Sequence, residues 1–231
     1  MIELISILIT TYNVESFVER AINSALNQTY PNIEIIIVDD CSNDRTWEKI
    51  RRFSKKAVMV RHEKRKRVSA ALNTALKVAH GDFIARLDGD DQLYPKILER
   101  EAAVLRGHTE CGFVYCDYEE IDEKEKLIRQ VHLPEFSSQL AHEIDYIAMG
   151  NLVRKSCYDN IGWYDEKMKK QEHYDWSIRL FSKYKGLHIP EILFAYTRHP
   201  KQATAQTDDL RFYTEKIRQK YGLRNDEVVR W

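Results

Sequence analysis

Hydrophobic residues in the first half of the chain follow two alternating patterns. Short continuous apolar runs, typical of strands buried on both faces, cover residues 4–9, 33–38, 57–60 and 83–87. Between these runs, apolar residues recur at helical spacing over 17–26, 47–53 and 71–79. Strict alternation of strand and helix predicts a parallel sheet with helices on both faces.

Two of the apolar runs end in carboxylates. Asp39 and Asp40 follow the second predicted strand, and Asp88, Asp90 and Asp91 end the fourth. Because ligands of parallel sheets bind at the carboxyl ends of the strands, we expect both acidic groups to share one crevice. Clustered carboxylates repel one another, and a divalent cation such as Mn²⁺ or Mg²⁺ removes that cost. For an isolated cluster of this kind, the alternative is a solvated acidic turn ahead of a helix.

The second half of the chain is less regular. Residues 113–118 and 127–131 are predicted strands around a charged turn, and 174–184 is a predicted helix. No Gly/Ser-rich linker separates the halves, so we expect residues 1–231 to form one domain.

Charge and composition narrow the possible partners. Lys plus Arg and Asp plus Glu each number 36, which argues against a nucleic-acid binder that relies on bulk positive charge. The four cysteines lack the spacing of a zinc site or a disulfide framework. We see no signal peptide and no apolar run of bilayer length, so a cytoplasmic location is expected, with peripheral attachment to the membrane face left open.

Several motifs occur in a specific order along the chain. They are ITTYN at 9–13, VDDCSNDRT at 38–46, AALNTA at 70–75 and GDFIARLDGDD at 81–91. Together they resemble a family 2 glycosyltransferase with a GT-A fold. The resemblance implies a Rossmann-like α/β domain with a mostly parallel sheet flanked by helices and a mixed α+β C-terminal portion. Residues 1–118 would be the nucleotide-sugar-binding half and 119–231 the acceptor-side half.

The resemblance also implies a reaction. A sugar would move with inversion from a nucleotide diphosphate donor, a UDP-sugar being favoured, to a hydroxyl of a saccharide or lipid-linked saccharide acceptor. Such transfers build cell-envelope, capsule and other polysaccharides. The enzyme must hold the nucleotide, neutralise the diphosphate leaving group and remove a proton from the acceptor.

Residues for nucleotide binding follow from the motif positions. Thr11, Tyr12 and Asn13 would contact the base and ribose at the end of the first strand. Asp39 would accept a hydrogen bond from the imino N–H of uracil or guanine. The alternative for Asp39 is a partner for the dipole of the next helix.

Residues for the diphosphate follow in the same way. Asp90 would ligate the metal directly, and Asp88 would contact the ribose or a metal-bound water. Arg198 and His199 match a late basic motif that closes over the diphosphate or completes the metal shell. Asp91 would contact the side chains that bind the metal, or would contact the acceptor. The alternative for Arg198 and His199 is a pair of residues in a solvated loop.

The general base departs from the pattern of the family. Relatives commonly carry Glu-Asp before the helix at 174–184, with the Asp as the base, whereas this chain has Glu172 and His173. We rank Glu172 first, His173 second and Asp175 third as the catalytic group. The alternative for His173 is a cap of the following helix.

Other functions stay open beside a glycosyltransferase. The histidine in place of the expected base is compatible with a non-catalytic subunit that binds sugar nucleotides. A nucleotidyltransferase is disfavoured, because the first strand is not followed by a Gly-rich phosphate loop. The dense basic run at residues 61–67 can attract a diphosphate, an anionic acceptor or a membrane surface, or can be a solvated loop.

Overall fold

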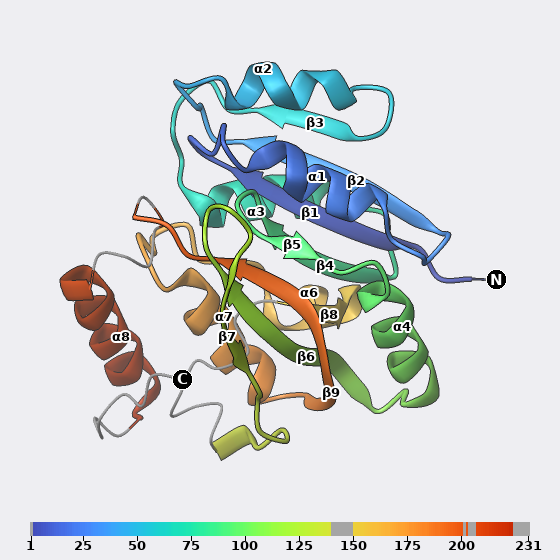
Figure 1. Ribbon diagram of the computed structural model, residues 1–231. Helices are drawn as coiled ribbons and strands as arrows, with labels where there is room; N and C mark the ends of the chain where they lie inside the picture. Colours follow the sequence, from blue (N-terminus) through green and yellow to red (C-terminus); the bar gives the residue numbers. More distant parts are fainter. Residues whose placement is uncertain (1, 140–149, 201, 203–206, 224–231) are drawn as a thin grey trace.

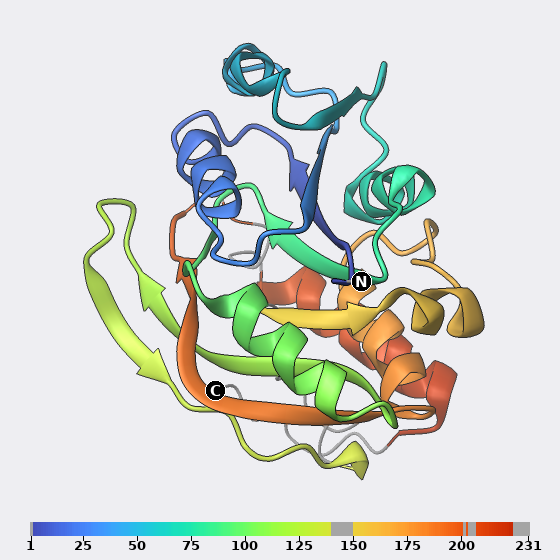
Figure 2. The same ribbon diagram turned by 90° about the vertical axis from the view of Figure 1, so that its right-hand side faces the viewer.

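The computed structural model describes residues 2–139, 150–200, 202 and 207–223. Within these residues nine strands form one sheet, and Figures 1 and 2 show helices on both of its sides. The strand order is β3-β2-β1-β4-β8-β6-β9-β5, and β7 pairs with β6 outside this path. Within the described residues, no helix is long and apolar enough to cross a bilayer.

The first half of the chain forms the parallel part of the sheet, as expected. Its strands are β1 (Ile5–Thr11), β2 (Ile33–Asp39), β3 (Val58–Arg61) and β4 (Phe83–Asp88). The helical segments between them are α1 (Val18–Leu26), α2 (Thr46–Ile50), η1 (Arg51–Phe53) and α3 (Val68–Val78). All pairings among these strands are parallel.

The second half makes the sheet mixed. Its strands are β5 (Gln92–Leu93), β6 (Cys111–Ile121), β7 (Leu127–Val131), β8 (Asn151–Arg154) and β9 (Lys185–Thr197). Strand β8 runs antiparallel to β4 and β6, whereas β9 runs parallel to β6 and antiparallel to β5. The helices are α4 (Ile97–Gly107), α6 (Lys155–Ile161), α7 (Glu172–Phe181) and α8 (Thr207–Tyr221).

Both faces of the sheet are buried, which explains the continuous apolar runs. Ile7 and Ile9 of β1 pack toward α1 and α4, while Leu8 between them packs toward α3 and α7. Each of these side chains is at most 1% exposed. Full burial of an aliphatic side chain contributes about 1.5–3 kcal/mol, so the central strands fix the scaffold that carries the strand ends.

Strand register brings the two acidic strand ends to one edge. Thr11 is paired with Asp39 of β2, and Thr10 is paired with Asp88 of β4. Gly89 lets the chain turn close against β1, since a Cβ there would lie 2.8 Å from Thr11 Cγ2 and 3.0 Å from the Thr10 carbonyl oxygen. The acidic ends of β2 and β4 thus lie on either side of the end of β1, at one edge of the sheet, as expected. That they line a single crevice stays a prediction.

Candidate active site at the carboxyl ends of β2, β1 and β4

Asp39 is fully buried and held by three side chains. Its Oδ2 accepts a hydrogen bond from the Ser42 backbone N–H at 3.1 Å and forms an ion pair with Arg61 Nε at 3.2 Å. Its Oδ1 accepts from the hydroxyls of Ser42 and Thr11. A carboxylate has about four acceptor sites, so a nucleobase would have to replace one of these donors. Arg61 has room to move, because its side chain is 40% exposed.

Tyr12 and Asn13 shape the turn after β1. The Arg65 guanidinium lies 3.9 Å from the centre of the Tyr12 ring and covers one face of it. Asn13, with a φ of 54°, donates its backbone N–H to Ser42 Oγ at 3.0 Å and accepts from the Asn43 backbone N–H at 2.9 Å. These bonds join the turn after β1 to the turn after β2, so residues 11–13 and Asp39 form one unit.

Asp40 anchors the basic loop that follows β3. The Asp40 carboxylate is buried and accepts from His62 Nδ1 at 2.8 Å and from the backbone N–H groups of Lys66 at 2.8 Å and Arg67 at 2.7 Å. His62 Nε2 in turn lies 3.0 Å from Thr74 Oγ1 on α3. Sequence reasoning missed this role, although a second carboxylate at the end of a strand was the available signal.

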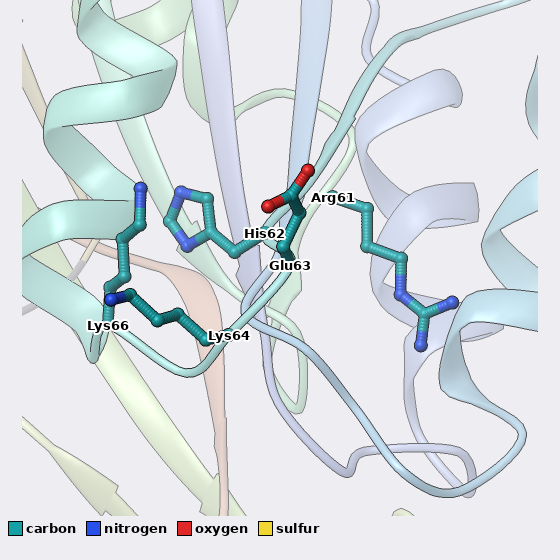
Figure 3. A pocket seen from close by; sticks show the side chains of 5 residues that line it. All are labelled: Arg61, His62, Glu63, Lys64 and Lys66. Atoms are coloured by element: carbon teal, nitrogen blue, oxygen red, sulfur yellow. The ribbon is translucent and has the colours of Figure 1, made fainter.

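The basic loop that follows β3 borders a cavity of about 490 Å³, close to Asp39 and its partner Arg61. Its lining is Arg61, His62, Glu63, Lys64 and Lys66. Figure 3 shows the two lysine side chains on one side of His62, with Arg61 extending to the other. Asp88 and Asp90 do not line this cavity. The cavity therefore lies beside the basic loop and not at the end of β4.

An arginine joins the acidic strand end to the first candidate base. Arg86, which is buried on β4, contacts Asp88 Oδ2 at 3.1 Å and Glu172 Oε1 at 3.4 Å through the same nitrogen, Nη2. Burial lowers the pKa of Arg86, but the Asp88 and Glu172 carboxylates outweigh it and raise that pKa above the usual value. Its Nη1 is buried without a hydrogen-bond partner among the described residues. An arginine within a buried strand was the signal that sequence reasoning passed over.

Asp90 meets the late basic motif. His199 Nε2 lies 2.9 Å from Asp90 Oδ2, and the His199 ring packs 4.6 Å from the centre of the Phe17 ring. The Asp90 backbone carbonyl accepts from the hydroxyl of Thr197 at the end of β9. Two segments 109 residues apart in sequence thus share this part of the site.

The buried Asp91 carboxylate links the end of β4 to the end of β9. Its Oδ1 accepts from the Thr197 backbone N–H at 2.9 Å, and its Oδ2 has no partner among the described residues. Burial raises the pKa of the Asp91 carboxyl well above its usual value, and the Asp90 and Asp88 carboxylates raise it further. Asp91 therefore ties the strand end to β9.

The polar groups beside Asp90 are suited to a hard divalent cation. Carboxylate oxygens of Asp88 and Asp90 are ligands that suit both Mn²⁺ and Mg²⁺. The imidazole of His199 is a softer donor, which Mn²⁺ accepts more readily than Mg²⁺ does. In the part of the chain that the structure describes, no three His, Cys, Asp or Glu side chains form a ready metal cage. Ions that keep one or two carboxylate ligands and take the rest from phosphates and water need no such cage.

Arg198, the other residue of the late basic motif, contacts a carboxylate on β6. Arg198 pairs with Glu120 Oε1 at 2.5 Å and lies 5.0 Å from the centre of the Tyr196 ring. Burial of Glu120 acts to raise its pKa, but Arg129 and Arg198 outweigh it and lower that pKa. The guanidinium of Arg198 thus points to β6, next to the His199–Asp90 pair along the chain.

Helix α7 presents all three candidate bases, in different surroundings. Glu172 at its first residue faces Arg86. His173 is buried, and its Nδ1 lies 2.9 Å from Ser177 Oγ one turn later. Asp175 is 1% exposed and bonds Lys220 Nζ at 2.6 Å and the Tyr221 hydroxyl at 3.1 Å, both on α8. Of the three, Glu172 is the one that the structure places beside the acidic strand end.

The sequence of this chain is similar to those of known glycosyltransferases. The chain is 29% identical over 223 residues to the glycosyltransferase EpsJ of Bacillus subtilis, which covers 88% of this chain but 64% of EpsJ. It is 44% identical over 90 residues to WfaP of Escherichia coli, named as a UDP-Glc:alpha-D-GlcNAc-diphosphoundecaprenol beta-1,3-glucosyltransferase, over 38% of this chain and 36% of WfaP. The chain thus spans less than two thirds of either relative.

Solved structures show the same fold. S. aureus TarS 1-349 in complex with UDP-GlcNAc superposes with a TM-score of 0.78 at 19% identity, covering 97% of this chain and 68% of TarS. The mannosyltransferase PcManGT of Pyrobaculum calidifontis, in complex with GDP-Man and Mn2+, gives 0.74 at 18% identity, covering 98% of this chain and 66% of that one. The family model described as "Glycosyl transferase family 2" matches residues 6–162. This chain, with its GT-A architecture, therefore belongs to family 2 of the glycosyltransferases.

Proposed function

We propose that this protein transfers a sugar, with inversion, from a nucleotide diphosphate donor to a hydroxyl of a lipid-linked saccharide. The observation that carries the proposal is the convergence of Asp39, Asp88 and Glu172 around the ends of three strands. A UDP-sugar is the favoured donor, since WfaP is named for UDP-Glc and TarS was solved with UDP-GlcNAc. The diphosphoundecaprenol acceptor in the name of WfaP supports a lipid-linked acceptor here, in the synthesis of an envelope or capsule polysaccharide.

The nucleotide would lie over the turns after β1 and β2. Tyr12 offers an aromatic face, and Asp39 offers an acceptor for the base imino N–H once Arg61 gives way. Thr11 and Asn13 hold these two groups in a fixed relation. Because uracil and guanine both carry an imino N–H, the contact at Asp39 favours these bases over adenine and cytosine.

Asp90 and Asp88, with His199, would hold a divalent cation, Mn²⁺ or Mg²⁺. The cation would neutralise charge on the diphosphate leaving group. Asp91 and Thr197 keep Asp90 in place, and Arg86 keeps Asp88 in place. The Mn2+ in the PcManGT complex supports this use of the acidic strand end.

Glu172 would remove the proton of the acceptor hydroxyl. Transfer with inversion needs one base on the side from which the acceptor attacks. Arg86 holds the Glu172 carboxylate beside Asp88. His173 and Asp175 remain second and third choices, since His173 lies against Ser177 and Asp175 bonds a residue of α8.

A thermal-shift screen of nucleotide diphosphates and sugar nucleotides, each with and without Mn²⁺, tests the proposal. Ligands that bind the folded form raise its melting temperature by mass action. We expect a uridine diphosphate to give the largest shift, with Mn²⁺ enlarging it, and a matching UDP-sugar to be consumed. A protein that binds the donor but turns none over across a broad acceptor panel would be a non-catalytic subunit instead.

A further inference from the structure

Positive charge is concentrated in one continuous segment of this neutral chain. Residues 45–67, which we call the basic flank, contain eleven Lys or Arg residues and two Asp or Glu residues. Because Lys plus Arg equals Asp plus Glu over the whole chain, the remaining residues carry an equal excess of negative charge. The protein is therefore strongly polarised, although its net charge is zero.

The basic flank forms one edge of the molecule. It comprises α2, η1, β3 and the loop up to Arg67. Among the described strands, β3 is the last of the sheet and pairs with β2. Figure 1 shows α2 and β3 together at the top of the molecule. Val58, in the middle of this edge, is 49% exposed.

Most of these charges are not neutralised within the protein. Four of the basic residues pair with carboxylates. Arg45 pairs with Glu15, Lys49 with Glu19, Arg52 with both Glu19 and Glu48, and Arg61 with Asp39. The other seven are exposed and have no carboxylate within ion-pair distance among the described residues: Arg51, Lys55, Lys56, Lys64, Arg65, Lys66 and Arg67.

The buried Asp40 keeps the loop part of the flank in a defined conformation. Its bonds to His62 and to the backbone N–H groups of Lys66 and Arg67 fix the backbone, while the lysine and arginine head groups stay exposed. Crowded like charges repel one another, and an extended anionic surface relieves this repulsion.

The loop also borders the candidate donor site. Arg61 pairs with Asp39, and Arg65 covers Tyr12. A surface that contacts the flank would thus lie next to the place where the nucleotide is expected. This arrangement fits an acceptor that is delivered from the same surface.

We propose that the basic flank docks the protein on an anionic phospholipid surface, and this inference rests on the proposed transfer to a lipid-linked acceptor. Lys and Arg side chains near such a surface each add to the attraction. Nucleic acid fits less well, because single-strand sites interleave basic residues with aromatic faces. In the flank, Trp47 and Phe53 are half-buried and pack on the core.

Vesicle co-sedimentation of the whole protein tests the docking. The probe is vesicles of phosphatidylglycerol with phosphatidylcholine, compared with phosphatidylcholine alone, at low and high salt. The test variant is Arg51→Gln/Lys55→Gln/Lys56→Gln, which lies away from the donor site. The matched control is Lys96→Gln/Lys169→Gln/Lys185→Gln, which removes the same charge from exposed positions outside the flank.

We expect salt-sensitive binding to the anionic vesicles only, reduced at least about tenfold in the flank variant and unchanged in the control. Equal binding of the two variants, or no binding to anionic vesicles at low salt, would overturn the proposal. Tighter binding to duplex DNA or to single-stranded RNA than to the vesicles would also overturn it, in favour of a nucleic-acid surface.

A nucleotide thermal shift on the same variants separates the two proposals. If the UDP shift persists while vesicle binding is absent, docking is wrong and the transferase proposal stands. If vesicle binding persists with no shift from any nucleotide diphosphate, the transferase proposal fails, and the docking surface stands without its acceptor.

Discussion

At the scale of single residues, Glu172 is best placed to act on the acceptor. Arg86 holds its carboxylate beside Asp88, at the strand end that is expected to bind the diphosphate. We expect Glu172→Gln to lower turnover by about 10²–10⁴-fold, because a general base contributes about that much. The shift in melting temperature with UDP and Mn²⁺ should stay close to that of the wild type.

Variants of the two neighbouring candidates serve as controls for Glu172. Asp175→Asn should lower the free energy of unfolding, since Asp175 bonds Lys220 and Tyr221 on α8, while leaving turnover per folded molecule near normal. If His173→Ala abolishes turnover and Glu172→Gln does not, the general base is His173 and not Glu172.

Glu101 on α4 gives a separate prediction about pH. Its carboxyl is fully buried with neither oxygen partnered among the described residues, and burial raises its pKa well above the usual value. Between the usual carboxyl pKa of about 4.3 and the raised one, only the unfolded chain loses this proton. The free energy of unfolding should therefore fall as pH rises through that window, by up to about 1.4 kcal/mol per pH unit.

Urea denaturation across that pH window measures the effect. Glu101→Gln cannot lose a proton, so its stability should fall less with rising pH than that of the wild type. Glu99→Gln, an exposed position on the same helix, should retain the wild-type slope. Identical slopes for all three proteins would show that Glu101 does not stay protonated.

At the scale of elements, the close approach of β4 to β1 sets the geometry of the acidic strand end. In Gly89→Ala the new Cβ would meet Thr11 Cγ2 and the Thr10 carbonyl oxygen, and backbone cannot move aside as a flexible side chain can. We expect a loss of about 1–3 kcal/mol in the free energy of unfolding and weaker nucleotide binding. Chemical denaturation and the UDP thermal shift measure the two effects.

Gly107→Ala is the matched control for Gly89. A Cβ at Gly107, the last residue of α4, meets no atom within 4 Å. Alanine is the better helix former, so this variant should be as stable as the wild type or gain about 0.5–1 kcal/mol. Equal effects of the two substitutions would argue against a close approach at the strand end.

The sequence predicted elements well where burial is uniform. Strands β1, β2 and β4 are buried on both faces, so their apolar runs are continuous and easy to recognise. Strand β9 was missed, because exposed and buried positions are mixed along it and its register with β6 shifts twice near residues 116–118. Strand β8 has only four residues, Asn151–Arg154, too few for a clear pattern.

At the scale of the whole molecule, both halves of the sheet contribute to the expected cation site. Asp88 and Asp90 follow β4, while His199 follows β9. We expect the chelator EDTA, and separately Asp90→Asn, to remove the part of the UDP thermal shift that depends on Mn²⁺. A saturating ligand at about 100 times its Kd adds roughly 2.7 kcal/mol, so the loss is measurable.

Asp122→Asn, in the exposed turn before β7, is the control for Asp90. It should keep the full response to Mn²⁺. An Asp90 variant with an undiminished response to Mn²⁺ would contradict the assignment of the cation to this strand end.

The sequence by itself determined the alternation of strands and helices, the carboxylates at the strand ends and the motifs of the family. These features are encoded in residues close together along the chain, because burial of a strand or of a helix face repeats over a few residues. Only the tertiary structure decided that Arg86 joins Asp88 to Glu172, that Asp40 anchors the basic loop and that Asp175 bonds α8. Such contacts depend on strand register and on the packing of helices against the sheet, which join residues far apart in sequence and leave no local pattern.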